Sequence, residues 1–429
     1  MSTPPLGALA PQVGDVPGPR SRELSARLAA VESPAFEARR EAREARSGEE
    51  QGAIVYAEAH GDNVRDVDGN VFVDLTAGFG ALALGHTPEV LSAALSRELG
   101  RLPLALGDVY AAESKVLACE RIAQLFPEPG ARVMLGSSGA DAVTAALKTV
   151  ELHGRAGLVA FRGAYHGLSH GPLAACGLSP AFREPFAGSL SKNVQFAPFP
   201  ESAAELDGAL GEVRRLLASG AIGGVLVEPL LGRGGCVEPP AAFLPELRRL
   251  CDEAGALLVV DEIWTGLGRS GAWLASAPVV PDVLCLGKAL GGGFPISACV
   301  GRREVMAAWG AHGGTLIHTA THFGSPLSAV AALTTLEQIV ERQLPARALR
   351  VGEVLMGKLR AAGFEAQGRG LMVGVRVGPG ALGIARRLLR AGYIVLTGGT
   401  AGDVLTLSPA LTVDEALLDG FVGALAATQ

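Results

Sequence analysis

A chain of 429 residues is long for a single hydrophobic core and suits a large domain with a smaller one beside it. The net charge of −6 gives no basic surface that would indicate nucleic acid binding, and no run of about eighteen apolar residues predicts a membrane span. The first residues, MSTPPLGALAPQ, lack a basic region followed by an apolar core, so we expect no secretory signal. Residues 1–20 are rich in proline and glycine, and we expect them to be poorly ordered.

The six cysteines are scattered along the chain without the CxxC spacing of a zinc site. Two of them, Cys285 and Cys299, lie in or beside apolar runs. Free buried thiols of a cytoplasmic protein are therefore a better interpretation than disulfides or zinc ligands.

Taken in chain order, the first elements give little sign of function. Residues 21–50 are highly charged and predict a solvated helix. Residues 55–75 have the pattern of short strands around the hairpin signal Asp68-Gly69. The glycine-rich stretch AGFGALALGHT then leads into a helical pattern. Phe79 in that stretch is a candidate pocket wall, and a core phenylalanine is an equally good interpretation.

The segment that follows a short strand at 132–135 predicts a helix with an exposed beginning. In GSSGADAVTAALKTVEL the apolar residues recur with helical spacing, and Ser137 or Ser138 is a natural N-cap. Gly139 allows another group to approach the backbone. The first amides of a helix favour an anion, so a phosphate group suits this position. Alone, the pattern also describes an ordinary capped helix.

Further strands are predicted at 157–161 and 221–227, and a helix at 243–253. This alternation of strands and helices predicts a mostly parallel sheet that is covered on both faces. His166 and His170 follow the first of these strands without further ligands at a suitable spacing, so we expect no metal site.

An acid and a lysine follow the next two predicted strands. The apolar run 256–260 ends at Asp261, and the run 283–286 delivers Lys288 beside a glycine cluster. Because the carboxyl ends of parallel strands form one edge, where ligands bind, we expect the two side chains to lie together. The pair suits pyridoxal phosphate chemistry: the lysine would form a Schiff base, and the carboxylate would keep the pyridine nitrogen protonated.

The stretches DEIWTG, GRSG, PD and GKALGGGFP, in this order, resemble the class III aminotransferases of fold type I. The resemblance implies an α/β fold with a mostly parallel seven-stranded sheet domain and a smaller α+β domain built from both termini. It assigns residues 21–75 to the N-terminal part of the small domain, 76–320 to the large cofactor-binding domain and 321–429 to the C-terminal small domain. It also implies pyridoxal 5'-phosphate as cofactor, a small-molecule amine donor with a carbonyl acceptor, and a homodimer.

The resemblance further implies roles for residues that surround the cofactor phosphate. Ser138, Gly139 and Ala140 correspond to the S-G-x-E-A motif that holds the phosphate, with Asp141 in place of the usual glutamate. Thr321, in THFGSP, corresponds to the threonine that crosses to the neighbouring subunit and binds its cofactor phosphate. That segment is also an ordinary loop before a helix.

Other correspondences concern the cofactor ring. Tyr165 matches the aromatic residue that stacks on one face of the pyridine, and Ile263 matches the aliphatic residue on the other face. His166 would help to position the cofactor, or is a satisfied structural histidine. Trp264 replaces the family glutamine that donates to the ring hydroxyl oxygen, and its indole N–H is a possible substitute donor.

Three positions depart from the family pattern for recognising substrate carboxylates. Leu168 and Thr406 stand where many members have arginines, and Arg233 stands where several members have a glutamate that pairs with the second of them. A buried arginine needs a counter-anion. We expect Arg233 to bind an acidic group of a substrate, or alternatively to pair with a protein acid such as Glu238 or to face solvent.

The resemblance therefore predicts transamination, with Lys288 and Asp261 as the catalytic residues. Related enzymes use the same lysine for decarboxylation, epimerisation or the shift of an amino group within one molecule, and the sequence leaves these reactions open. A non-catalytic binding protein on the same fold is a more remote alternative.

Overall fold

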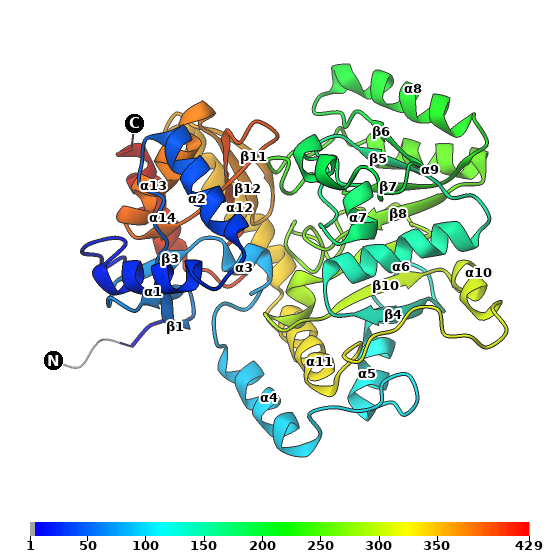
Figure 1. Ribbon diagram of the computed structural model, residues 1–429, viewed down its shortest axis with the longest axis horizontal. Helices are drawn as coiled ribbons and strands as arrows, with labels where there is room; N and C mark the ends of the chain where they lie inside the picture. Colours follow the sequence, from blue (N-terminus) through cyan, green and yellow to red (C-terminus); the bar gives the residue numbers. More distant parts are fainter. Residues whose placement is uncertain (1–4, 429) are drawn as a thin grey trace.

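The computed structural model describes residues 5–428, and its largest element is a seven-stranded sheet (Figure 1). Five neighbouring strands are parallel, while β10 runs antiparallel to both β9 and β4. This arrangement confirms the predicted mostly parallel sheet. In spatial order the strands are β4 (Arg132–Gly136), β10 (Ser297–Gly301), β9 (Val283–Leu286), β8 (Leu257–Asp261), β7 (Ile222–Val227), β5 (Gly157–Phe161) and β6 (Val194–Ala197).

Alternate residues of the central strands are buried on opposite faces of this sheet. Val259 of β8 packs in a cluster with Ala142 and Ala146 of α6 (Gly139–Leu152). Leu258 and Val260 belong to the cluster on the other face, which includes residues of α8 (Leu206–Leu217) and α9 (Phe243–Ala254). Successive side chains of a strand point to opposite faces, so these apolar runs need helices on both sides.

The smaller part of the molecule brings together both ends of the chain. In its first sheet, β13 (Tyr393–Ile394) pairs in parallel with β3 (Val71–Asp74), which adjoins β2 (Asn63–Asp66) and then β1 (Tyr56–His60). The second sheet is antiparallel and comprises β11 (Glu365–Arg369), β12 (Met372–Arg376), β15 (Val404–Leu407) and β14 (Leu396–Gly398). Its helices are α1 (Pro19–Ala29), α2 (Pro34–Ser47), α12 (Leu344–Ala361), α13 (Ala381–Arg390) and α14 (Glu415–Ala426).

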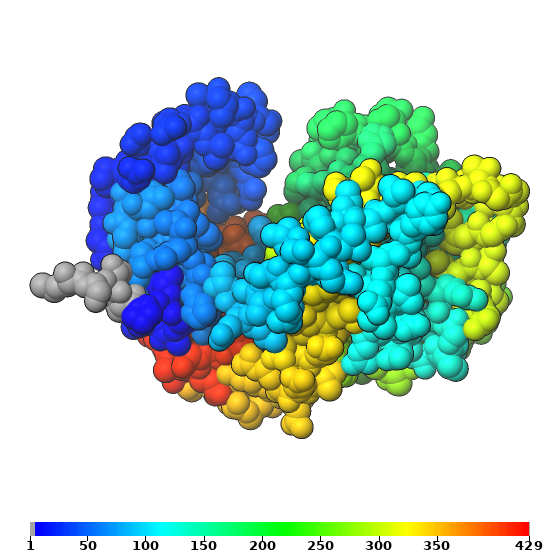
Figure 2. Space-filling view, turned by 90° about the horizontal axis from the view of Figure 1, so that it is seen from below, coloured from blue at the N-terminus to red at the C-terminus, as the bar shows by residue number. Residues whose placement is uncertain are grey.

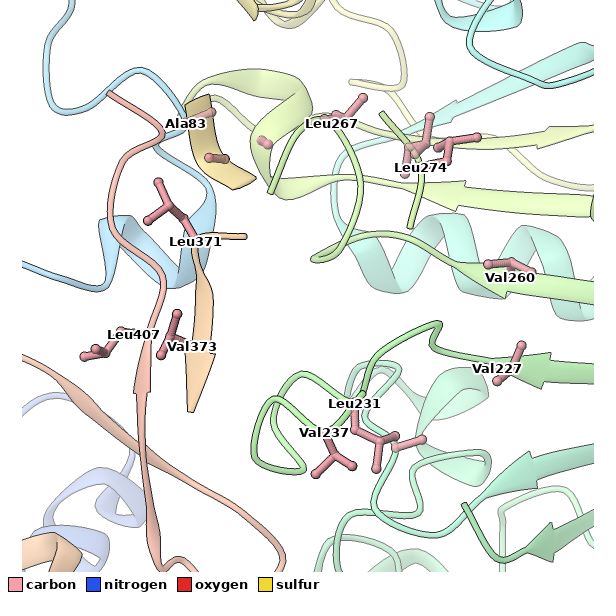
Figure 3. Packing of buried hydrophobic residues seen from close by; sticks show 14 of the residues in the cluster. Ala83, Val227, Leu231, Val237, Val260, Leu267, Leu274, Leu371, Val373 and Leu407 are labelled. Atoms are coloured by element: carbon pink, nitrogen blue, oxygen red, sulfur yellow. The ribbon is translucent and has the colours of Figure 1, made fainter. Parts of the chain in front are cut away.

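The two parts share one continuous hydrophobic core. Figure 3 shows Val227 and Val260 near the ends of large-sheet strands, and Leu371, Val373 and Leu407 on the small-sheet side. All five side chains belong to the same buried cluster. The small part is therefore packed directly against the loops at the carboxyl edge of the large sheet.

The helix α11 (Pro326–Glu341) lies between the parts that the sequence assigned to different domains. It contacts α4 (Glu89–Arg101), α5 (Glu113–Ala123) and the 3-10 turn η4 (Lys288–Gly291). These contacts lead us to propose a domain boundary after α11 instead of at residue 321. The remaining short helices are α3 (Ala77–Gly80), α7 (His170–Ala174), α10 (Arg303–Met306), η1 (Pro180–Phe182), η2 (Glu184–Phe186), η3 (Ala203–Glu205), η5 (Ala307–Gly310) and η6 (Gly378–Gly380).

The N-terminal segment differs from the expectation in two ways. Gln12 exchanges backbone hydrogen bonds of 2.9 and 2.8 Å with Val71, so the predicted poor order does not hold for this stretch; residues 1–4 lie outside the described range. The charged region forms two helices instead of one, because Pro34 begins α2 and has no amide hydrogen to continue α1. Within residues 5–428, no helix is long and apolar enough to cross a membrane.

Candidate active site

Lys288 follows β9 after one glycine, Gly287, and has an unusual backbone conformation. Its φ of 44° lies in the left-handed region, which costs about 1–3 kcal/mol for a residue other than glycine and often marks a functional site. Its Nζ lies 4.0 Å from the centroid of the Trp264 ring. Burial lowers the pKa of Lys288 to about 8, because the positive charge is poorly solvated there, although Asp261 and Glu228 oppose the shift. The amine is therefore easily deprotonated near neutral pH.

Asp261 ends β8 and is held by two neighbours. Its Oδ2 lies 2.7 Å from Nδ1 of His166, and its Oδ1 accepts a 3.0 Å hydrogen bond from the amide of Ile263. The carboxylate is 4 % exposed. The other ring nitrogen of His166, Nε2, is buried without a protein partner. His166 and the Ile263 amide thus fix the orientation of the Asp261 carboxylate.

A second buried acid, Glu228, follows β7 at the same edge. Its Oε1 accepts a 2.7 Å hydrogen bond from the amide of Tyr165, and its Oε2 accepts one of 2.9 Å from the amide of Gly232. Burial, with a further contribution from the charge of Asp261, raises the pKa of Glu228 to about 6. Glu228 was not among the predicted site residues, although its place directly after a predicted strand was a usable signal.

The beginning of α6 offers free amides next to these groups. Ser138 and Asp141 form a capping box: the Ser138 hydroxyl accepts from the Asp141 amide, and the Asp141 carboxylate accepts from the amides of Ser137 and Ser138. The amides of Gly139 and Ala140 have no partner within residues 5–428. They are directed outward at the positive end of the helix dipole, which suits a phosphate group.

Most of the predicted site residues line one cavity at the carboxyl edge of the large sheet. Of those residues, Ser138 is the helix cap beside the cavity and is not part of its wall. The wall is made of Gly139, Ala140, Tyr165, His166, Gly167, Glu228, Arg233, Asp261, Ile263, Trp264 and Lys288.

The side chains predicted to flank the cofactor ring have defined surroundings. A Cβ at Gly139 would lie 3.0 Å from Ile263 Cδ1, so the glycine lets Ile263 pack closely against α6. Tyr165 has the guanidinium carbon of Arg233 4.6 Å from its ring centroid. Trp264 turns its ring toward Lys288, while its buried Nε1 has no partner and lies beside Gly80. The indole N–H is therefore not taken up by a protein acceptor, and its donation to the cofactor ring stays a prediction.

Besides Ser138, three predicted residues lie outside this wall. Phe79 is 52 % exposed and has a φ of 60°. Thr321 is exposed to solvent in a loop before α11. Thr406 is buried on β15 with its Oγ1 beside Gly398 and without a hydrogen-bond partner. The chain thus does not bring Phe79 and Thr406 to the Lys288 cavity, whereas Thr321 was predicted to serve the neighbouring subunit and stays a prediction.

Arg233 has no acidic partner among the residues that the structure describes. Glu238, which the sequence offered as a partner, instead lies 3.2 Å from Arg369. The interpretation of a Glu238 pair is therefore wrong. The guanidinium group of Arg233 is half-buried over Tyr165 and available to an anion.

These features fit pyridoxal phosphate on chemical grounds. The cavity combines an amine of lowered pKa, an oriented carboxylate and two unpaired helix amides, which correspond to the aldehyde, ring nitrogen and phosphate of that cofactor. No group of three or more histidine, cysteine, aspartate or glutamate side chains within residues 5–428 is arranged to hold a metal ion.

Comparison with known sequences shows the family to which this chain belongs. A model of the class III aminotransferases matches residues 45–428. The acetylornithine aminotransferase of Mycobacterium tuberculosis is 37% identical over 386 residues, covering 87% of this chain and 91% of the relative. The acetylornithine aminotransferase of Methanopyrus kandleri is 35% identical over 381 residues, covering 87% and 93%.

Solved structures have the same fold. The ornithine aminotransferase of Toxoplasma gondii superposes with a TM-score of 0.79 at 29% identity, covering 87% of this chain and 89% of that one. An amine transaminase from an uncultivated Pseudomonas species, solved in its pyridoxal-phosphate-bound form, gives 0.81 at 28% identity and covers 87% and 94%. The chain therefore belongs to the class III aminotransferase family and is a pyridoxal-phosphate-dependent aminotransferase of fold type I.

Proposed function

We propose that Lys288 and Asp261 are the catalytic residues with which this aminotransferase moves an amino group from an amine or amino acid to a keto acid or aldehyde. The observation that carries the proposal is their convergence on one cavity, at the edge of which α6 presents unpaired amides. Pyridoxal phosphate, when bound, supplies a carbonyl group that accepts the amino group and a ring that accepts electrons.

Each protein group has a distinct task in this proposal. With a pKa of about 8, Lys288 exists in both protonation states near neutral pH and can take a proton from the substrate carbon and return it. Asp261, oriented by His166 and the Ile263 amide, holds a proton on the ring nitrogen. The amides of Gly139 and Ala140, next to the Ser138 cap, hold the phosphate.

The substrates include a molecule with an acidic group that contacts Arg233. This part of the proposal is supported by the absence of an acid beside Arg233 in the described chain, and by its place in the wall that contains Lys288. Leu168 and Thr406 provide no positive charge at the positions where relatives have arginines. The similarity to acetylornithine aminotransferases therefore supports amino transfer as the reaction. It does not identify the substrate.

We also propose a homodimer in which Thr321 reaches the neighbouring site, because an exposed Thr321 has no partner of its own in the described chain. A cytoplasmic location is supported by six cysteines that are all free.

The catalytic assignment is tested with Lys288→Ala. The variant should still bind the cofactor but lose amino transfer almost completely, since it lacks the only amine side chain in the cavity wall, which forms the Schiff base and moves the proton. Borohydride reduction of the wild-type holoenzyme followed by peptide mapping should find the cofactor on Lys288. A label on Lys148 or Lys358 would refute the assignment, and release of carbon dioxide without transfer of an amino group would indicate a decarboxylase.

The role of Arg233 is tested by Arg233→Gln and the charge-conserving Arg233→Lys. A charge-assisted contact contributes about 1.5–3 kcal/mol, so the glutamine variant should lower kcat/KM for acidic substrates roughly ten- to hundredfold. Uncharged amines should be nearly unaffected, and lysine should restore part of the loss. Equal losses for acidic and neutral substrates would return Arg233 to a structural role.

A further inference from the structure

A second cavity, rich in arginine, adjoins the Lys288 site. It has a volume of about 350 Å³, within the range of about 300–1,000 Å³ that is typical of small-molecule sites. Figure 2 shows the cleft to which it belongs, between the blue N-terminal elements and the green segment of the large domain. Its wall contains Arg39, Arg43 and Arg46 of α2, and also Arg233, but no acidic residue. We refer to it as the arginine groove.

The three arginines of α2 share one face of the helix because of their spacing. Positions 39, 43 and 46 are separated by four and three residues, which places their side chains above one another. Of the three acids of α2, Glu37 pairs with Arg40, Glu44 accepts the amide hydrogen of Gln51, and Glu41 lies outside the groove wall. The groove side of α2 is therefore positively charged.

No protein carboxylate neutralises this charge in the described part of the chain. Arg39, Arg43, Arg46 and Arg233 form no ion pair there, whereas the nearby Asp403 is paired with Arg376 at 3.0 Å. Burial, and then the charges of Arg39, Arg386 and Arg46, lower the pKa of Arg43. Like charges held together without an anion are unfavourable, and a bound anion would relieve this cost.

The groove adjoins the Lys288 cavity at Arg233. This side chain is part of both walls. Its guanidinium group lies over Tyr165, whose ring contacts Phe182 edge-on with centroids 6.5 Å apart, and Phe182 is part of the groove wall. On the opposite side, a side chain at Gly402 would meet Nη2 of Arg46, so the loop between β14 and β15 closes the groove against α2. A substrate can thus extend from Lys288 past Arg233 toward α2.

We propose that the arginine groove is a substrate subsite for a phosphate group, located at the end of the substrate remote from the amino group that is transferred. This inference rests on the proposed transamination at Lys288 and names a class of substrate for it. Guanidinium groups bind phosphate through paired hydrogen bonds, and several of them together match a dianion better than a single carboxylate. The substrate class is therefore a phosphorylated amine or carbonyl compound.

The test compares substrates that differ only at the remote end. The wild-type holoenzyme and the triple variant Arg39→Gln, Arg43→Gln, Arg46→Gln are assayed with ω-aminoalkyl phosphates, ω-amino carboxylates and alkylamines of three to six carbons. Arg40→Gln is the matched control, because Arg40 lies on the same helix, outside the groove wall. Thermal unfolding establishes that the triple variant is folded.

The wild-type enzyme should prefer one of the phosphates over the alkylamine of equal length by at least about tenfold in kcat/KM. The triple variant should lose this preference, with alkylamines nearly unchanged, and Arg40→Gln should behave like the wild type. A preference equal to that for the carboxylates would overturn the assignment to phosphate. A preference that survives the triple variant would overturn the groove as its site.

The failure of transamination can be distinguished from the failure of this inference. If no amine of any class reacts, the proposed function is wrong, and binding of inorganic pyrophosphate to the holoenzyme, measured by calorimetry, then tests the groove alone. Binding that the triple variant weakens by about tenfold supports an anion site, and the absence of binding overturns it.

Discussion

Lys288 differs from an ordinary surface lysine in both its backbone and its surroundings. Its φ of 44° is unfavourable, and it is maintained by the strand before it and by the glycines after it. The aromatic face of Trp264, 4.0 Å from Nζ, replaces water on one side of the amine. Two nearby acids, Asp261 and Glu228, only partly offset the cost of burial. The residue is thus set up to release a proton at a pH where other lysines keep theirs.

A pH prediction follows at this scale. In the cofactor-free protein, acetylation of Lys288 by a small amine reagent should increase as the pH rises through about 8, because the neutral amine is the nucleophile. A lysine with the ordinary pKa of about 10.4 should respond only at higher pH. Peptide mass spectrometry measures both in one sample. Coincident profiles would contradict the lowered pKa.

The same shift has a consequence for stability. Because the pKa of Lys288 is lower in the folded than in the unfolded chain, the unfolded chain binds more protons between about pH 8 and 10.5. Lys288 therefore destabilises the fold below pH 8, and this cost diminishes as the pH rises through that window. Lys288→Met should raise the free energy of unfolding of the cofactor-free protein more at pH 7 than at pH 10.

At the scale of elements, the beginning of α6 illustrates how a strand and a helix build an anion site. The capping box of Ser138 and Asp141 satisfies the amides that precede the helix and leaves those of Gly139 and Ala140 free. Asp141 performs this task with a side chain one methylene shorter than the family glutamate. Gly139 has a second function, since its lack of a side chain lets Ile263 approach the helix.

Gly139→Val should therefore weaken the retention of the cofactor. The added Cβ would lie 3.0 Å from Ile263 and displace that side chain into the cavity, so we expect the cofactor Kd to rise by roughly tenfold, about 1.4 kcal/mol. The release of cofactor on dialysis, followed by absorbance, measures the change. Gly208→Val in α8 is a suitable control, because a Cβ there meets no other atom within 4 Å. Equal cofactor retention in both variants would argue against the packing role.

The elements that the sequence predicted well are those whose apolar pattern is unambiguous. The runs of β8 and β9 are flanked by polar residues, and both strands lie within a residue of their predicted places. The strand β10 was missed because ISACVG mixes small and apolar residues and follows a glycine cluster. Its antiparallel position depends on pairing with β4 and β9, which no local pattern encodes.

The sequence correctly placed some of the predicted site residues in one cavity and misplaced others for a similar reason. Asp261 and Lys288 follow strands of one sheet, so topology alone brings them together. Thr406 was assigned by correspondence to a family arginine, whereas a shorter side chain on β15 packs locally against Gly398. The arginine groove escaped prediction because its residues come from α2, the segment after α7, the loop after β7, α13 and the β14–β15 region, which only the folded chain brings together.

At the scale of the whole molecule, the two ends of the chain form the small domain that packs on the carboxyl edge of the large sheet. The parallel pairing of β13 with β3 links residues more than 300 positions apart, and the shared core continues across the boundary. Large hydrophobic side chains nevertheless remain exposed near the α4–α5 connection, including Leu106 and Tyr110. Such residues are consistent with a surface covered in a larger assembly.

Thr321 supplies a decisive test of that assembly. Our proposal places it in the neighbouring subunit's phosphate site, so Thr321→Val should reduce cofactor affinity although the residue is outside the Lys288 cavity of its own chain. Mixing inactive Lys288→Ala subunits with an impaired Thr321 variant should give heterodimers in which one site has both an intact lysine and an intact threonine. Activity should then approach about a quarter of the wild-type value at equal mixing, because half of the dimers are mixed and each has one repaired site.

Thr319→Val, which changes a neighbouring exposed loop residue, is the matched control and should not impair the site. Verified subunit exchange without recovery would show that Thr321 acts within its own subunit or has no role in the site.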